Sequence, residues 1–393
     1  MLNPVDSMPI CHKELSGADF LEGFYVTDRP RDDEDIVNSK IFFAGRRAPT
    51  LDSKLIYDSW AAALGCDKLS MRLLSGLHAH VTLFMGIGKV GDTVLLLPEL
   101  AGGHFATAGI LKRLGYNVVD LPIDMENRCV DVQASLRLIE ASKAKFLFID
   151  RSEGLVYEDF SKIAGHSGIY SIFDASQYMS AILSGRYKSP FDMGFDLMVS
   201  TLHKSFPGPQ KALVASKCDD AAWKLVQQAM SSYVSSSHVR STYLAGFSLG
   251  YLCQLKEFAD NMLKNSVALE NALVTEGVIS EPRSPSSQPT QHIWIPCESR
   301  EDAFSFYKHL EKIRIYCNYR LLPYGIGYGL RLGTTLATFL GMRTSHVREL
   351  ATVIGQARSS GFSLPLRHQV RALAGGIYDE GQTLHAFLPG EGI

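Results

Sequence analysis

Short apolar runs of β-forming residues alternate with helical stretches over much of the chain, and this alternation constrains the fold more than any other feature. The runs are TVLLLPE, YNVVDLPI, AKFLFID, IYSIFDA, FDLMVST and KALVAS. Strands that alternate with helices predict an α/β fold with a parallel or mixed sheet. Because the runs are apolar throughout rather than at every second position, we expect both faces of the sheet to be covered.

The segment ahead of these runs has a different character. Residues 1–55 are polar and irregular and include the charged run DRPRDDED. Such a run is typical of a solvated loop. We therefore expect an N-terminal arm over 1–55, followed by a large α/β domain over 56–250.

The last third of the chain predicts a second, smaller domain. A helical stretch at about 244–277 is long enough to bridge two domains, and a Pro/Ser-rich linker follows at 280–289. Two strand candidates, HIWIP and YGLRLG, come next. Helical runs at 300–312 and 343–359 accompany them. We expect a smaller α+β domain over 251–393.

Composition and charge exclude several classes of protein. The formal net charge of −2, from 39 basic and 41 acidic side chains, argues against a nucleic-acid-binding or anionic-membrane surface. No apolar run approaches the roughly 18 residues of a membrane span, and the first residues lack a secretory pattern. The seven cysteines form no CxxC pair, and His78 and His80 lack further ligand residues, so no metal site is expected. A cytoplasmic enzyme or binding protein remains.

Lys204 lies in the most informative segment, STLHKSFPGPQKALVAS. It follows the apolar run FDLMVS and precedes Phe206-Pro207-Gly208-Pro209, a rigid turn. A lysine held on ordered, buried backbone has a lowered pKa and can form a Schiff base with an aldehyde. A surface lysine after a strand is the alternative that this segment leaves open.

Asp174 ends the apolar run IYSIF, thirty positions before Lys204. A carboxylate at a strand end of an α/β sheet lies at the edge where ligands bind. Beside a pyridine ring it would keep the ring nitrogen protonated, as in pyridoxal 5'-phosphate (PLP), whose protonated ring is an electron sink. A helix-capping or turn aspartate is the alternative.

Two further segments carry groups suited to a phosphate and a ring. Ser75 and Gly76 precede an apolar helical run, where backbone N–H groups and a hydroxyl favour an anion. His104 follows two glycines after the run TVLLLP and could stack on an aromatic cofactor. Ordinary helix capping and a structural histidine are the alternatives.

Arg331 stands in the otherwise apolar strand candidate YGLRLG. An arginine in such a strand needs an anionic partner. Its planar guanidinium fits a carboxylate through two hydrogen bonds. The partner is either the α-carboxylate of a substrate or an internal Asp or Glu, and this segment does not decide between them.

The order of these segments resembles the serine hydroxymethyltransferase family of fold-type-I PLP-dependent enzymes, from about Lys40 to Met342. The family has a Ser-Gly phosphate loop, then GGH, DxxH, TTHK, GP and R-(I/L)-G-T. In this chain the corresponding residues are Ser75-Gly76, Gly102-Gly103-His104, Asp174-Ala175-Ser176-Gln177, Thr201-Leu202-His203-Lys204, Gly208-Pro209 and Arg331-Leu332-Gly333-Thr334.

The resemblance implies an aspartate aminotransferase-like large domain with a mixed, mostly parallel sheet. It also implies that PLP is the cofactor, that Lys204 forms the Schiff base and that Arg331 binds the substrate carboxylate. Around the cofactor it places Ser75, Gly76, Leu77, His104, Ser152, Asp174, Gln177, Thr201 and His203. Because the family's sites form at a subunit interface, a homodimer is implied as well.

Departures from the family pattern concern the residues tied to proton handling and folate. The Tyr-Tyr-Gly-Gly segment is Phe42-Phe43-Ala44-Gly45, and the family's glutamate has only Asp35 at equal spacing, beside Glu34. Two histidines of the family are also replaced: the second histidine of GGHLTH is Thr107, and the histidine of DxxH is Gln177. The second threonine of TTHK is Leu202, and the segment GPRGG is GPQKA. These changes argue against folate as a substrate.

We expect a PLP-dependent transferase or lyase that acts on a free amino acid and an aldehyde. The expected chemistry is aldol, retro-aldol or transaldol cleavage between Cα and Cβ of a serine- or threonine-like substrate, through a glycine quinonoid. Lys204, Asp174, His104 and the Asp35/Glu34 pair are the expected catalytic residues. Another PLP reaction, namely transamination, decarboxylation, racemisation or β/γ-replacement, is the main alternative. A non-catalytic binding protein is disfavoured, because Lys204, Asp174 and Arg331 are all present.

Overall fold

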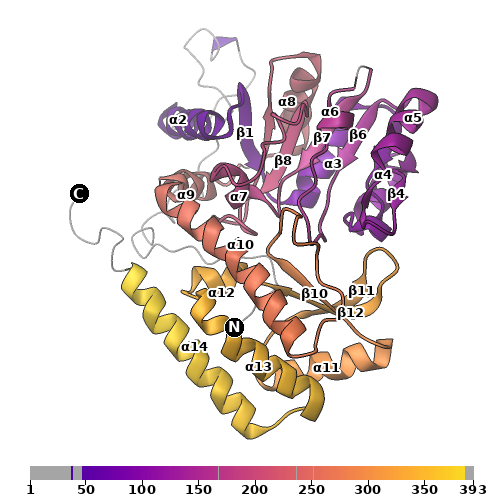
Figure 1. The fold of residues 1–393 in the computed structure, drawn as a ribbon. Coiled ribbons are helices and arrows are strands. Elements are labelled where there is room, and N and C mark those ends of the chain that lie inside the picture. Colours follow the sequence, from indigo (N-terminus) through magenta and orange to yellow (C-terminus); the bar gives the residue numbers. More distant parts are fainter. Residues whose placement is uncertain (1–36, 39–46, 167, 236, 251, 386–393) are drawn as a thin grey trace.

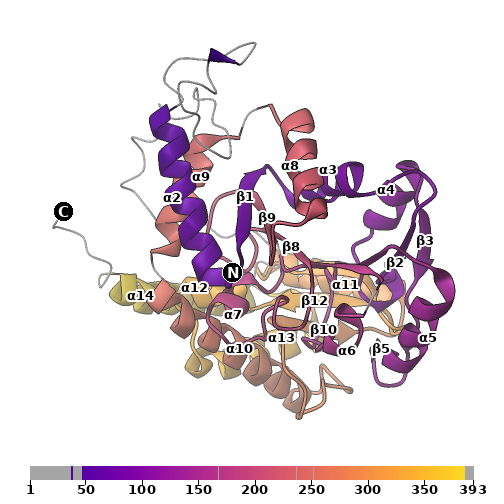
Figure 2. The same ribbon diagram turned by 90° about the horizontal axis from the view of Figure 1, so that it is seen from above.

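The computed structural model describes residues 37–38, 47–166, 168–235, 237–250 and 252–385. Figures 1 and 2 show a larger part built on a seven-stranded sheet and a smaller part, below it in Figure 1, built on a three-stranded sheet. Among the described residues, no helix combines the length and the apolar character that crossing a membrane requires.

The large sheet has the strand order β1-β9-β8-β7-β6-β2-β3. Its strands are β1 (Lys68–Leu73), β2 (Thr93–Leu96), β3 (Asn117–Asp120), β6 (Phe146–Ile149), β7 (Tyr170–Asp174), β8 (Leu197–Thr201) and β9 (Ala212–Ser216). Strand β9 pairs antiparallel with both β1 and β8, whereas the other pairings are parallel. The predicted mixed, mostly parallel sheet is therefore confirmed, and all six predicted runs form strands of it.

Helices flank both faces of this sheet (Figures 1 and 2). They are α2 (Arg47–Leu64), α3 (Gly76–Ile87), α4 (Thr107–Arg113), α5 (Val132–Ser142), α6 (Ser161–Ala164), α7 (Met179–Leu183), α8 (Ala221–Tyr233) and α9 (Val239–Leu249). Short elements complete this part: a 3₁₀ turn, Glu99–Ala101, and the two-stranded ladder of β4 (Ile123–Asp124) and β5 (Cys129–Val130).

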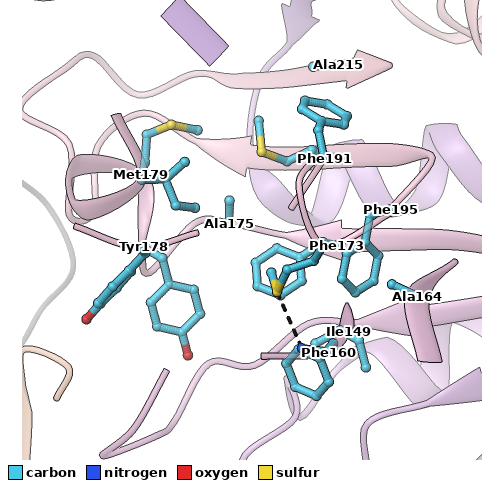
Figure 3. Packing of buried hydrophobic residues seen from close by; sticks show 14 of the residues in the cluster. Ile149, Phe160, Ala164, Phe173, Ala175, Tyr178, Met179, Phe191, Phe195 and Ala215 are labelled. Carbon is cyan, nitrogen blue, oxygen red and sulfur yellow. Dashed lines mark hydrogen bonds between the residues drawn. The ribbon is translucent and has the colours of Figure 1, made fainter. Parts of the chain in front are cut away.

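Alternate side chains of each strand enter two different hydrophobic clusters. In β6, Leu147 and Ile149 join one cluster and Phe146 and Phe148 the other. Figure 3 shows part of the first cluster, where Ile149 lies near Phe160 and Phe173. Because both faces are buried, the central strands β6 (FLFI) and β8 (LMVST) are mostly apolar rather than alternating, as the sequence predicts.

The smaller part has the antiparallel sheet order β10-β12-β11. Its elements are β10 (His292–Pro296), β11 (Asn318–Leu322), β12 (Gly327–Gly333), α10 (Leu252–Thr275), α11 (Arg300–Lys312), α12 (Thr335–Phe339), α13 (Thr344–Ser360) and α14 (Leu364–His385). Helix α10 contributes Leu255 to the core of the larger part and Leu269 to that of the smaller part. The domain limits at 55 and 250 remain predictions.

Two local expectations are wrong. The single helix expected over 244–277 is two helices, because α9 ends at Leu249 and α10 begins at Leu252. The N–H of Gly250 bonds to the carbonyl of Phe247, which closes α9 with a tight final turn. The segment 1–55 is not irregular throughout, since α2 already begins at Arg47.

Candidate active site

The ends of two neighbouring parallel strands form the centre of the site. Asp174 is the last residue of β7 and Thr201 the last of β8. Carboxyl ends of parallel strands meet at one edge of a sheet, which is where such sheets bind ligands. Both side chains are buried, and the Thr201 hydroxyl has no hydrogen-bond partner among the described residues.

Lys204 stands in the loop that joins β8 to β9. The loop is closed by two backbone bonds, Leu202 N–H to the carbonyl of Lys211 (2.9 Å) and Gly208 N–H to the carbonyl of Leu202 (2.9 Å). Lys204 is half-buried and has no hydrogen bond or ion pair within the described ranges. The backbone that carries the amine is ordered, and the charge of Lys204 acts on Asp174, whose pKa it lowers.

The Asp174 carboxylate has two partners. Its Oδ2 lies 2.7 Å from Nε2 of His80, and its Oδ1 accepts the N–H of Ser176 at 2.8 Å. Burial acts to raise the pKa of Asp174, but the hydrogen bond and charge of His80, and the Lys204 charge, lower it to about 2. The hydrogen bond from Ser176 is one that a turn aspartate makes, so this feature of the alternative interpretation is present. The carboxylate of Asp174 remains ionised at neutral pH.

His80 is a site residue that the sequence did not reveal in this role. It is buried on α3, where it was considered only as a metal ligand. No group of three or more potential metal ligands occurs within the part of the chain that the structure describes. Its partner Asp174 is 94 positions away, and only the packing of α3 against the sheet brings the two together.

A second buried carboxyl group, Asp150, lies near this network, and neither of its oxygens has a hydrogen-bond partner among the described residues. Asp150 follows β6, and burial raises its pKa well above the usual value, although Thr107 and the backbone of His104 act against this. The Thr107 hydroxyl also lies 3.4 Å from Nδ1 of His80. Thr107, which replaces a family histidine, therefore lies between His80 and Asp150.

The beginning of α3 lies against the end of β8. Ser75 is the N-cap residue, and its hydroxyl accepts the N–H of His78 at 3.3 Å. A Cβ atom added to Gly76 would lie 3.1 Å from Cγ2 of Thr201, so a larger residue would crowd this position. Ser75 therefore caps the helix, which is the alternative that the sequence left open. The same helix N-terminus faces the strand end that carries Thr201.

His104 is positioned by the two glycines before it. Gly102 has φ +87°, and a Cβ atom there would lie 1.9 Å from the carbonyl oxygen of Glu153. The His104 ring lies edge-on to that of His80, with centroids 6.2 Å apart. Burial, and then the charge of His80, lower the pKa of His104 to about 4, so the ring is neutral at pH 7.

Arg331 is buried on β12, and its Nη1 donates to Oε1 of Glu153. The same oxygen accepts Nη1 of Arg320, from β11. The internal-carboxylate alternative is therefore realised. Glu153 was not identified from the sequence, because it lies 178 positions from Arg331.

The other predicted residues lie at different distances from this centre. Ser152 is half-buried, and its N–H donates to the carbonyl of Gly102. Gln177 is buried, and its side-chain oxygen accepts Nε2 of Gln291 at 3.2 Å. His203 is half-buried beside Lys204, and Leu77 is exposed on α3. Asp35, Glu34 and residues 42–45 lie outside the described residues.

The arrangement fits PLP. A helix N-terminus at Ser75–Gly76 suits a phosphate group, and the ionised Asp174 suits a protonated ring nitrogen. The amine of Lys204 has no competing partner in the described structure, and the orphaned hydroxyl of Thr201 offers a donor at the same place.

The chain is similar to several known proteins. The family model described as serine hydroxymethyltransferase matches residues 54–354. A serine hydroxymethyltransferase from Pyrobaculum calidifontis is 27% identical over 85% of this chain and 80% of its own length. An L-threonine:uridine-5'-aldehyde transaldolase from an Amycolatopsis species is 25% identical over 81% of this chain and 79% of its own length. The crystal structure of L-threonine transaldolase from Pseudomonas fluorescens has the same fold, with a TM-score of 0.88 and 18% sequence identity. The match covers 95% of this chain and 87% of that one.

Proposed function

The chain belongs to the serine hydroxymethyltransferase family of PLP-dependent enzymes, and we propose that it is a folate-independent aldolase or transaldolase. In this proposal it breaks the Cα–Cβ bond of a threonine-like β-hydroxy amino acid. The β-hydroxyl loses its proton, an aldehyde leaves, and the electron pair remains at Cα. The glycyl unit then takes up a proton or adds to the carbonyl carbon of a second aldehyde.

One observation carries the proposal: Asp174 ends β7, and Lys204 follows the neighbouring parallel strand β8, beside the N-terminus of α3. When bound there, PLP supplies an electron sink for a carbanion at Cα. The amine of Lys204 would hold the cofactor through its aldehyde. Asp174, ionised because its pKa is about 2, would favour a protonated ring nitrogen.

The remaining described residues orient the substrate and handle its oxygen. Arg331 receives the α-carboxylate, which fixes the direction of the bond that breaks. Nδ1 of His104 lies 3.3 Å from the N–H of Ala106 and accepts it, so the neutral ring carries its proton on Nε2. That N–H can donate to the oxygen of the aldehyde as it leaves or arrives. Asp35 or Glu34 is proposed as the base for the β-hydroxyl.

Independence from folate is supported by the sequence around the N-terminal segment. Phe43 lacks the phenol of the family's second tyrosine, and Asp35 stands where the family has the glutamate tied to folate chemistry. These changes remove groups needed for the folate reaction while the residues for PLP and an amino acid remain. A free amino acid and an aldehyde are therefore the proposed partners.

We propose that the protein is cytoplasmic, where its scattered cysteines would stay reduced, and that it is a homodimer, as the family's interface sites imply. Two apolar side chains near His104 support this: Phe105 is 73% exposed and Leu100 is 50% exposed in the single chain. Exposed large apolar residues next to a site are typical of an interface.

The proposed function is tested by incubating the purified holoenzyme with L-threonine and measuring acetaldehyde. Acetaldehyde should form without folate, and an added second aldehyde should yield a new β-hydroxy amino acid. Lys204→Ala should abolish the cofactor absorbance and the activity, whereas Lys224→Ala, on the exposed face of α8, should change neither. A normal cofactor spectrum with no aldehyde from any β-hydroxy amino acid would refute the proposal.

A further inference from the structure

One carboxylate oxygen serves two arginines beside the proposed carboxylate site. Oε1 of Glu153 accepts hydrogen bonds from Arg331 and from Arg320. The side chains of Glu153 and Arg331 are 2% and 3% exposed, whereas that of Arg320 is 29% exposed. The three groups therefore form a chain from the buried Arg331 to the partly exposed Arg320.

Sheet register places the two arginines on the same face. Arg331 of β12 is directly opposite Asn318 of β11, and Arg320 is two positions beyond Asn318. Side chains two apart on a strand share a face, and such diagonal neighbours are within reach of long side chains. Glu153 lies between them from the other side, on the loop that follows β6.

The backbone of Glu153 is fixed, so only its side chain can change partners. Its N–H donates to the carbonyl of Gly102 at 3.0 Å. Gly102 in turn packs against the Glu153 carbonyl so closely that any Cβ atom would clash. A change of partner therefore requires side-chain rotation alone.

Charge decides what happens when a substrate carboxylate arrives. Two arginines and one glutamate carry a net charge of +1, which one further carboxylate neutralises. A substrate carboxylate on Arg331 would lie beside Glu153, and two like charges at one guanidinium repel. Glu153 already bonds to Arg320, so it can leave Arg331 without becoming an unpaired buried charge.

We propose that Glu153 is an internal competitor for Arg331, displaced onto Arg320 when an amino-acid α-carboxylate binds. Glu153 thereby keeps Arg331 paired and oriented, at the expense of substrate affinity. This inference rests on the proposed function, because it requires Arg331 to receive that carboxylate.

The test is calorimetric titration of the holoenzyme with glycine. Glu153→Gln removes the competing charge, so the Kd for glycine should fall roughly tenfold. Arg320→Met removes the alternative partner, so the Kd should rise by roughly threefold to tenfold. Glu140→Gln and Arg137→Met, at exposed positions of α5, should leave the Kd unchanged.

The two variants should shift the Kd for glycine in opposite directions, so each of them tests the inference by itself. An unchanged or higher Kd in Glu153→Gln would overturn the inference, and if that variant does not fold, an unchanged Kd in Arg320→Met would do so. If wild-type protein binds glycine with these shifts but yields no aldehyde from L-threonine, the inference stands and the proposed reaction fails. If wild-type protein binds no glycine, both fail.

Discussion

Two buried arginine–glutamate pairs occupy different regions of the molecule and differ in how their donors are used. Arg283, in the Pro/Ser-rich linker, donates Nε to Oε2 of Glu270 at 2.6 Å. Its other nitrogens donate to backbone carbonyls of Leu155, Thr290 and His292. This guanidinium is committed to the scaffold and ties the linker to both parts of the chain.

The pair of Arg331 and Glu153 is built differently. Glu153 shares one oxygen between two arginines that come from two strands. A guanidinium whose nitrogens bond to a buried carboxylate and to three backbone carbonyls cannot accept a ligand without breaking structure, whereas a shared carboxylate can be exchanged. The contrast shows that burial alone does not separate a structural ion pair from a functional one, but the partners of the guanidinium do.

The largest effect is expected at the scaffold pair. Arg283→Met should leave the buried charge of Glu270 uncompensated and lower the free energy of unfolding by about 3–5 kcal/mol. Urea unfolding measures this loss, and the Kd for glycine should be unchanged. A loss below about 1 kcal/mol would show that the two pairs do not differ as described.

The next effect is expected at the site pair and concerns binding. Arg331→Lys keeps the charge but loses the planar fork, so the Kd for glycine should rise roughly tenfold to a hundredfold. Calorimetric titration measures the Kd, and the cofactor absorbance should persist because Lys204 is untouched. An unchanged Kd would mean that Arg331, like Arg283, only stabilises the fold.

A third, smaller effect concerns Asp174 and depends on pH. Its pKa of about 2 in the folded protein is below the ordinary value of about 3.9. The stability this shift contributes is therefore present above pH 4 and is lost as the pH falls towards 2. His80→Asn removes the positive charge, so the pKa of Asp174 should rise, and about 1 kcal/mol should be lost at neutral pH.

Thermal unfolding of both proteins between pH 2 and 6 measures this difference. The acid-induced loss of stability should begin at a higher pH in the His80→Asn protein. If both proteins lost stability over the same acidic pH range, His80 would not be the group that keeps the Asp174 carboxylate ionised.

The smallest effect is expected at an exposed pair. Lys54 and Asp58 are one turn apart on α2, 2.5 Å from each other, with side chains 48% and 58% exposed. Lys54→Ala should lower the free energy of unfolding by no more than about 0.5 kcal/mol, as urea unfolding can measure. A loss comparable to that of Arg283→Met would remove the distinction between exposed and buried pairs.

Local patterns made much of the fold predictable. The six apolar runs became strands because both faces of the large sheet are covered. Strand β1 and strand β11 were missed, since KLSMRL and NYRLL are interrupted by charged and polar residues. The break after Leu249 was missed because a helical pattern continues on both sides of Gly250.

The site was predictable where a residue's place on its strand indicated its role. Asp174 and Lys204 follow apolar runs, so the edge of the sheet brings them together. His80 and Glu153 gave no such signal, because their roles come from partners 94 and 178 positions away. For the same reason the sequence left two partners open for Arg331.

Strand β9 runs against its neighbours, and this has a consequence for how the enzyme can vary. Thr201 is paired with Ala212 across β8 and β9, so the loop that carries Lys204 is clamped at both ends by interior strands. Substitutions in other loops can therefore accumulate while Lys204 keeps its position beside the sheet.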